Sequence, residues 1–152
     1  PVPMKSRIPL ILMLLASPLG AVSASNYLGA QRCRSCHEQT YQQWKASPHA
    51  RAHESLSPSE ARDPRCVGCH STAASEGLVG VQCESCHGPG RDYWPADIMA
   101  DIERARAAGL KKGDEARTCK TCHLDTSPSL LPFDYASAIL RVRHRSLERS
   151  QP

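Results

Sequence analysis

The strongest apolar pattern lies near the start of the chain, where residues 8–19 are almost all hydrophobic and follow Lys5 and Arg7. Small residues at 22–24 come next. Basic residues, a short apolar run and small residues, in that order, are typical of an export signal. We therefore expect residues 1–24 to be a cleaved signal peptide, with Met4 as its start and residues 1–3 upstream of it. Residues 25–152 would then form one mature domain.

An uncleaved membrane anchor is the alternative reading of this segment. Pro9 and Pro18 interrupt the apolar run, however, and the run is too short to span a bilayer comfortably. No cysteine lies near the expected cleavage point, which disfavours a bacterial lipid anchor. We expect no stable membrane span after cleavage, and a periplasmic or extracellular location.

Beyond residue 24 the apolar positions recur only over short distances, which predicts short helices separated by long loops. The segment 77–90 is rich in glycine and is expected to be loop, apart from one turn, and signals for strands are negligible. Four helices are predicted. The first covers 35–46, and the second begins after Ser47-Pro48 with His49 and His53 on one face. The third covers about 95–109 and buries Ile98, Ile102 and Ala105, and the fourth covers about 133–149 and aligns Ala136, Leu140, His144 and Leu147.

The composition adds a difficulty, because this chain has few side chains with which to fill an interior. Aromatic residues make up 5% of the 152 residues, Phe133 is the single phenylalanine, and mean hydropathy is −0.44. Twelve prolines and nine glycines further limit regular packing. Something other than side chains is needed to form the core.

All eight cysteines belong to four copies of one pentapeptide, Cys-x-x-Cys-His, and none is left over. This is the attachment signature of c-type haem, in which two thiols bond to the haem vinyl groups and the histidine ligates the iron. The attachment residues are therefore Cys33, Cys36, Cys66, Cys69, Cys83, Cys86, Cys119 and Cys122, and the proximal ligands are His37, His70, His87 and His123.

Cysteines at this spacing have two other uses in proteins. Four disulfides would suit an exported chain, and paired Cys-x-x-Cys elements build zinc sites. Neither use requires a histidine directly after every second cysteine. We therefore expect four haem c groups, whose apolar macrocycles would supply the missing core.

This reading sets the expected fold class as mainly α: a multihaem cytochrome c with short helices and long loops wrapped around four closely packed haems. Haems so close together exchange electrons readily, so electron transfer between redox protein partners is the expected function. The second and third motifs, separated by the shortest linker, are expected to hold neighbouring haems. The mature chain would carry 17 basic and 15 acidic residues, with no basic run interleaved with aromatics, and this disfavours nucleic acid as a partner.

Three histidines outside the motifs are candidates for the second axial positions: His49, His53 and His144. Low-spin electron-transfer haems generally take a second strong ligand. Three histidines cannot serve four irons, so one iron lacks a histidine partner. Met99 is the one methionine of the expected mature chain, and core packing and iron ligation are both open for it.

The chain resembles the tetrahaem cytochrome c-554 family, known from nitrifiers as the electron acceptor of hydroxylamine oxidoreductase. The similarity includes Trp44 followed by His49-Ala50, the second motif at 66–70, and the stretch 80–91, which contains the third motif and Gly88-Pro89-Gly90. The fourth motif with Leu124, and the closing segment from Phe133 to His144, complete it.

The resemblance implies that His49 and His144 are distal ligands, serving the fourth and third haems respectively. It also implies that the iron of His70 is five-coordinate, with Pro132-Phe133 shielding its open face. The family places a third distal histidine shortly after Gly-Pro-Gly, where this chain has none. For the iron of His37 the candidates are His53, then Met99, then a histidine from another chain.

Three functions are compatible with these features, and electron transfer is the first of them. An electron carrier needs only the features described. An enzyme that reduces a small nitrogen species such as nitric oxide at an open haem is the alternative, although no acid–base group is evident for it. A haem subunit of a filament or larger complex is the third, because a partner chain could complete the iron of His37.

Overall fold

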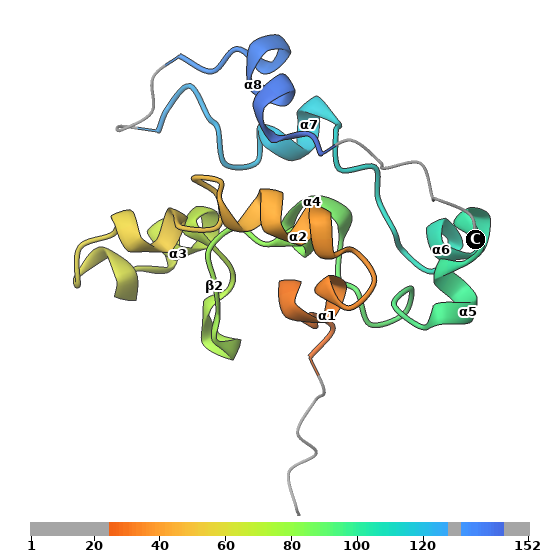
Figure 1. Ribbon diagram of the computed structural model, residues 1–152. Helices are drawn as coiled ribbons and strands as arrows, with labels where there is room; N and C mark the ends of the chain where they lie inside the picture. Colours follow the sequence, from red (N-terminus) through yellow and green to blue (C-terminus); the bar gives the residue numbers. More distant parts are fainter. Residues whose placement is uncertain (1–24, 128–131, 145–152) are drawn as a thin grey trace, which may run out of the picture.

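The computed structural model of this chain describes residues 25–127 and 132–144, and it is mainly helical, with short helices joined by long connections (Figure 1). The expected signal peptide at 1–24 lies outside the described residues. Within the described ranges no helix combines the length and the apolar character needed to cross a membrane.

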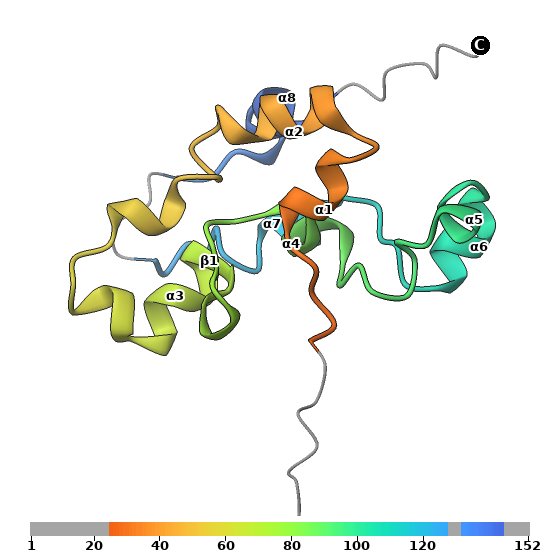
Figure 2. The same ribbon diagram turned by 60° about the horizontal axis from the view of Figure 1, so that its bottom comes forward.

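The helices lie around a central α4 (Cys83–His87), with α3 (Pro64–His70) on one side and α5 (Ala96–Met99) and α6 (Ile102–Ala107) on the other, as both views show (Figures 1 and 2). The remaining α-helices are α1 (Ala30–Arg34), α2 (Glu38–Lys45), α7 (Ala116–Cys119) and α8 (Tyr135–Val142). Three 3₁₀ turns, η1 (Ala52–Ser55), η2 (Glu60–Arg62) and η3 (Ala74–Glu76), join them.

A small antiparallel hairpin follows α3 and pairs β1 (Ser71–Ala73) with β2 (Leu78–Val79), in the register Ser71 to Val79 and Ala73 to Leu78. Gly77 turns the chain between the strands with a φ of 78°. The segment 77–90 was expected to be loop apart from one turn around the third motif; α4 is that turn, whereas β2 was not expected. The fold is nevertheless mainly α, as expected.

The first predicted helix, 35–46, is wrong at its start. The chain forms α1 and α2 instead, and His37 between them has a φ of −120° and a ψ of 47°, outside the helical region. The break falls inside the first cysteine motif. The sequence pattern therefore placed the helix correctly only from residue 38 onward.

The helix predicted after Ser47-Pro48 is also wrong. The chain forms turns and then only η1, and the Ser47 hydroxyl accepts a long bond of 3.4 Å from the Ala50 N–H. The His49 carbonyl accepts from the Val81 N–H at 2.9 Å, so this stretch is tied to the segment after β2 and does not continue as an α-helix.

The helix predicted at 95–109 exists as two pieces, because Asp101 caps a new helix. Its carboxylate accepts from the Glu103 and Arg104 N–H groups, and α6 begins there. Ala105 is fully buried, as expected, whereas Ile102 is 50% exposed, so that part of the prediction is wrong. The expected stop at Gly109 is correct, since this glycine has a φ of 106° just beyond α6.

The last predicted helix, 133–149, is shorter as α8. Asp134 caps it by accepting from the Ala136 and Ser137 N–H groups, and it ends two residues before His144. The predicted apolar stripe does not face a core, because Leu140 is 62% exposed. Leu147 and the end of the predicted helix lie outside the described residues.

The interior contains very little apolar side chain. Among residues 25–127 and 132–144, Ala30, Tyr93 and Ala105 are the buried hydrophobic residues. The Tyr93 hydroxyl donates to the Gly88 carbonyl at 2.6 Å. The expectation that side chains do not fill the interior is therefore confirmed for this part of the chain.

Candidate functional site

Each cysteine motif folds as one turn of helix. The second and third motifs lie in α3 and α4. In the first and fourth, the histidine N–H donates to the carbonyl of the first cysteine, at 2.9 Å for His37 and 3.0 Å for His123. Residues i, i+3 and i+4 share one face of such a turn. Both thiols and the imidazole of a motif therefore lie on the same side, as attachment of one planar group requires.

None of the eight cysteines forms a disulfide in this structure. Thiols of different motifs meet in two pairs. A hydrogen bond with Cys83 lowers the pKa of Cys33 and raises that of Cys83. Burial, with the neighbouring Cys122 thiol, raises the pKa of Cys69 to about 11. The first motif thus adjoins the third, and the fourth adjoins the second and, through Cys86, also the third.

A cavity of about 210 Å³ lies between three of the motifs. Cys69 of the second motif, Glu84 of the third and Cys122 of the fourth are on its wall. Thr72 and Ser85, also on the wall, are joined by a hydroxyl hydrogen bond of 2.7 Å. The second and third motifs are therefore close, as their short linker predicted.

Two histidines from outside the motifs face motif histidines. The ring centroids of His49 and His123 are 6.1 Å apart, and those of His144 and His87 are 5.8 Å apart. Two imidazoles that ligate one first-row metal ion from opposite sides, through bonds of about 2 Å, have their ring centres about 6 Å apart. Both spacings fit an iron between the rings.

Partial burial lowers the pKa of both outer imidazoles, which favours their neutral form. It lowers the pKa of His49, with a further contribution from His123. It also lowers the pKa of His144, with smaller contributions from His87 and His37. A neutral imidazole has the free nitrogen lone pair that a metal ligand needs.

Two motif histidines are oriented through their Nδ1 atoms. His87 Nδ1 donates to the Lys111 carbonyl at 3.1 Å, and His70 Nδ1 donates to the Ala52 carbonyl at 2.8 Å. The Ser55 hydroxyl is a second partner of His70 Nδ1, at 3.2 Å. Such bonds fix the tautomer that leaves Nε2 for a metal. The donor set therefore fits haem iron at these positions.

His53 lies beside the second motif, where its Nδ1 bonds the Ser71 hydroxyl at 2.9 Å. Among the described residues, no hydrogen bond or ring contact joins His53 to His37. The side chain of His37 is exposed to solvent. Met99, the other candidate in this chain, is half-buried at the end of α5. The assignment of His53 to the iron of His37 stays a prediction.

Phe133 stacks on the imidazole of His123, with centroids 4.3 Å apart and ring planes 17° from parallel. The resemblance implied that Pro132-Phe133 shields the iron of His70 instead. The structure places the phenylalanine ring against the fourth motif, and its expected shielding role at the second stays a prediction.

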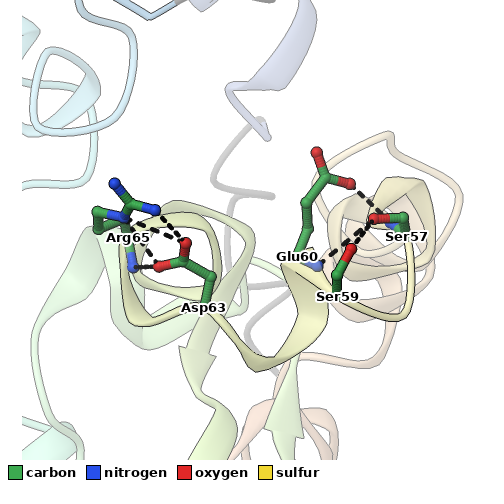
Figure 3. A network of polar contacts seen from close by, with 5 residues as sticks. All are labelled: Ser57, Ser59, Glu60, Asp63 and Arg65. Atoms are coloured by element: carbon green, nitrogen blue, oxygen red, sulfur yellow. Dashed lines mark hydrogen bonds and ion pairs between the residues drawn. The ribbon is translucent and has the colours of Figure 1, made fainter.

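Sequence reasoning missed the anchoring of α3, which carries the second motif. Asp63 caps this helix by accepting from the Arg65 N–H at 2.9 Å and pairs with the Arg65 guanidinium at 2.6 Å (Figure 3). Arg65 lowers the pKa of Asp63 to about 2. Nearby, the Glu60 carboxylate accepts from the Ser57 N–H at 2.8 Å. The signal was present in the sequence as Asp followed by Pro64 at the first helical position.

Sequence reasoning also missed Glu84, a carboxylate inside the third motif that is only 2% exposed. Its partners lie in residues 28–29 and at Gly90, so nothing local in the sequence marks it as buried.

Comparison with known proteins gives two matches. The family model described as cytochrome c554 and c-prime matches residues 32–88. Cytochrome c-554 of Nitrosomonas europaea is 31% identical over 151 residues, covering 75% of this chain and 64% of the relative. This chain thus spans a little under two thirds of that protein's length. No solved structure matches the chain.

Proposed function

We propose that residues 25–152, which are similar to cytochrome c-554, form an exported electron carrier with four covalently attached haem c groups. When bound, each haem supplies an iron that gains and loses one electron. The chain's own part is to attach the four groups, to set their axial ligands and to keep them close together.

Each motif would attach one group through its two thiols and supply one imidazole. The attachment pairs are Cys33 with Cys36, Cys66 with Cys69, Cys83 with Cys86, and Cys119 with Cys122. The corresponding first axial ligands are His37, His70, His87 and His123.

The observation that carries the proposal is the approach of His49 to His123 and of His144 to His87, at 6.1 and 5.8 Å between ring centroids. In each pair a histidine from a distant part of the chain faces a motif histidine. Two strong nitrogen ligands hold the coordination of an iron unchanged between its oxidation states, which favours rapid electron transfer over chemistry at the metal.

The second ligand for the iron of His37 is proposed to come from His53. Met99 is the other candidate in this chain, and a histidine of a partner chain is the third. The partners of an electron carrier are redox proteins, a donor and an acceptor, and export places them outside the cytoplasm.

The test is to count haems and electrons on the same preparation. The chain is produced with the c-type maturation machinery, and haem per chain is measured by alkaline pyridine spectroscopy and by intact mass. We expect four haems, and four electrons delivered per reduced chain to ferricyanide. Replacing both Cys119 and Cys122 with Ala should lower both counts to three.

Thr121→Ala is the matched control, because it changes a residue of the same motif without removing a thiol. It should retain four haems. A wild-type chain that carries fewer than four, or that holds haem but delivers no electrons, would overturn the proposal.

A second candidate, reduction of a small nitrogen species at an open iron, is favoured by the surroundings of His70. Its Nδ1 is held by Ala52 and Ser55, and within the described residues no second imidazole ring faces its own. Adding nitric oxide to the reduced protein should then change the spectrum of one iron. An unchanged spectrum, with every iron low-spin, would exclude this candidate.

A further inference from the structure

Glu84 is a buried acidic side chain inside the third haem-attachment motif. It lies between Cys83 and Cys86 and is 2% exposed. Burial of an ionised carboxylate is costly unless hydrogen bonds or opposite charge compensate it. The residue is outside the set that attaches or ligates haem, so its burial calls for another explanation.

Three backbone N–H groups hold its carboxylate. Gly29 donates at 2.7 Å and Gly90 at 2.6 Å, while Leu28 donates to both oxygens at 2.9 and 3.1 Å. These donors supply hydrogen bonds to both carboxylate oxygens, as burial of a polar group requires. Position 90 has no room for a side chain, because a Cβ there would lie 2.8 Å from Glu84 Oε1.

No cation balances this charge among the residues the structure describes, since their ion pairs do not include Glu84. The carboxylate is therefore a net negative charge in the interior, solvated by N–H dipoles only. Because Glu84 is only 2% exposed, its field is screened less than that of a surface carboxylate.

The charge lies between two attachment sites. The Cys33 thiol contacts the Gly29 carbonyl at 4.0 Å, and the N–H of that same glycine binds Glu84. Cys83 is the adjacent residue, and helices α1 and α4, which carry these cysteines, are in contact. The charge of Glu84 also raises the pKa of Tyr93, after burial as the main cause, so its field extends over this region.

We propose that Glu84 is a potential-setting residue, whose buried carboxylate lowers the reduction potentials of the haems attached by the first and third motifs. Reduction adds one electron to an iron, and a fixed negative charge nearby disfavours that addition. The inference rests on the proposed function, because it requires haem at these motifs.

The experiment compares Glu84→Gln with the wild-type holoprotein in a spectroelectrochemical titration. Gln removes the charge and keeps the length of the side chain. We expect two of the four haems to shift to higher potential, each by a threefold to tenfold change in the ratio of reduced to oxidised iron. A tenfold change corresponds to about 59 mV for a one-electron couple. Glu84→Asp, which keeps a carboxylate, should restore most of the lower potential.

Glu38→Gln is the matched control. It removes the same charge next to His37 of the first motif, but its carboxylate is half exposed and pairs with Arg34 at 2.7 Å. Screening by solvent should make its shift smaller than that of Glu84→Gln. Equal shifts in the two variants, or no shift in Glu84→Gln while its four haems are retained, would overturn the inference.

A purely structural role would give a different result, namely a less stable protein with unchanged potentials. If Glu84→Gln does not accumulate, Leu28→Lys provides a second test, because it places an ammonium group beside the carboxylate and keeps the backbone bonds. It should raise the same two potentials, and Leu28→Met should not. Absence of covalent haem from the wild-type chain would instead refute the proposed function itself.

Discussion

The imidazole rings of His49 and His123 face each other with their centroids 6.1 Å apart, although the two residues are separated by most of the described chain. Because this spacing fits an iron between them, His49→Ala should leave one iron with a single histidine ligand. We expect one of the four haems to become high-spin, seen in the electronic absorption and electron paramagnetic resonance spectra. Arg51→Ala, exposed in the same turn, should leave all spin states unchanged.

His144→Ala tests the second pair, in which the ring centroids of His144 and His87 are 5.8 Å apart. It should convert a different haem to high-spin, so that the spectra of the double variant with His49→Ala are the sum of the single changes. Arg143→Ala is the neighbouring control. A single variant with every iron still low-spin would show that another residue completes that site.

Gly113→Ala should perturb the third motif. A Cβ at position 113 would lie 2.8 Å from Cε1 and 2.9 Å from Nε2 of His87, whose ring is already fixed through Lys111. The crowding should cost about 1–3 kcal/mol of unfolding free energy and change the spectrum of one haem. The measurement is denaturant unfolding, followed through haem absorbance.

Gly68→Ala is the contrasting variant, because it lies inside the second motif with open space around the added methyl group. It lies in α3, where Ala is the better helix former, so stability should rise by about 0.5–1 kcal/mol. Equal losses in both variants would contradict the packing described around His87.

Asp63→Asn should weaken the start of α3 in a pH-dependent way. Hydrogen bonds from Arg65 lower the pKa of Asp63 to about 2. A lowered acid pKa in the folded state contributes stability that is complete above about pH 4 and is lost as the pH falls through 2. Thermal unfolding at pH 7 should therefore begin a few degrees earlier in the variant, and the difference should vanish near pH 2. Asp92→Asn, at an exposed position away from α3, is the control and should leave the start of α3 unchanged.

Haem attachment should be required for folding. Three buried hydrophobic residues among those described cannot offset the conformational entropy of the chain. A chain produced without haem maturation should show little helical circular dichroism and rapid proteolysis, whereas the holoprotein should resist both. A haem-free chain with native helix content would contradict this.

The sequence was sufficient for the class of fold and for the turn at the third motif, because both follow from local patterns. It failed where long-range contacts decide the backbone. The His49 carbonyl bonds Val81, and this contact replaces the α-helix expected after Pro48. Asp101 divides the third predicted helix because its side chain caps a new start.

Part of the candidate site was likewise predicted from the sequence, and part depends on long-range contacts. The pairing of His49 and His144 with particular motifs came from a family resemblance, and the structure brings those rings together. The position of His53 beside Ser71 depends on how η1 packs against the second motif, which no sequence pattern indicates. The burial of Glu84 likewise depends on residues 28–29, more than 50 positions away.

Cys33 of the first motif contacts Cys83 of the third, and Cys69 of the second motif contacts Cys122 of the fourth. The two pairs are therefore interleaved in the sequence. A cut between the second and third motifs would therefore separate both pairs at once. An N-terminal half would keep neither pair, and a C-terminal half would keep only the approach of Cys86 to Cys119 and Cys122. Two-motif fragments of this chain are not miniature versions of it, and any shortened functional form must retain interleaved segments from both halves.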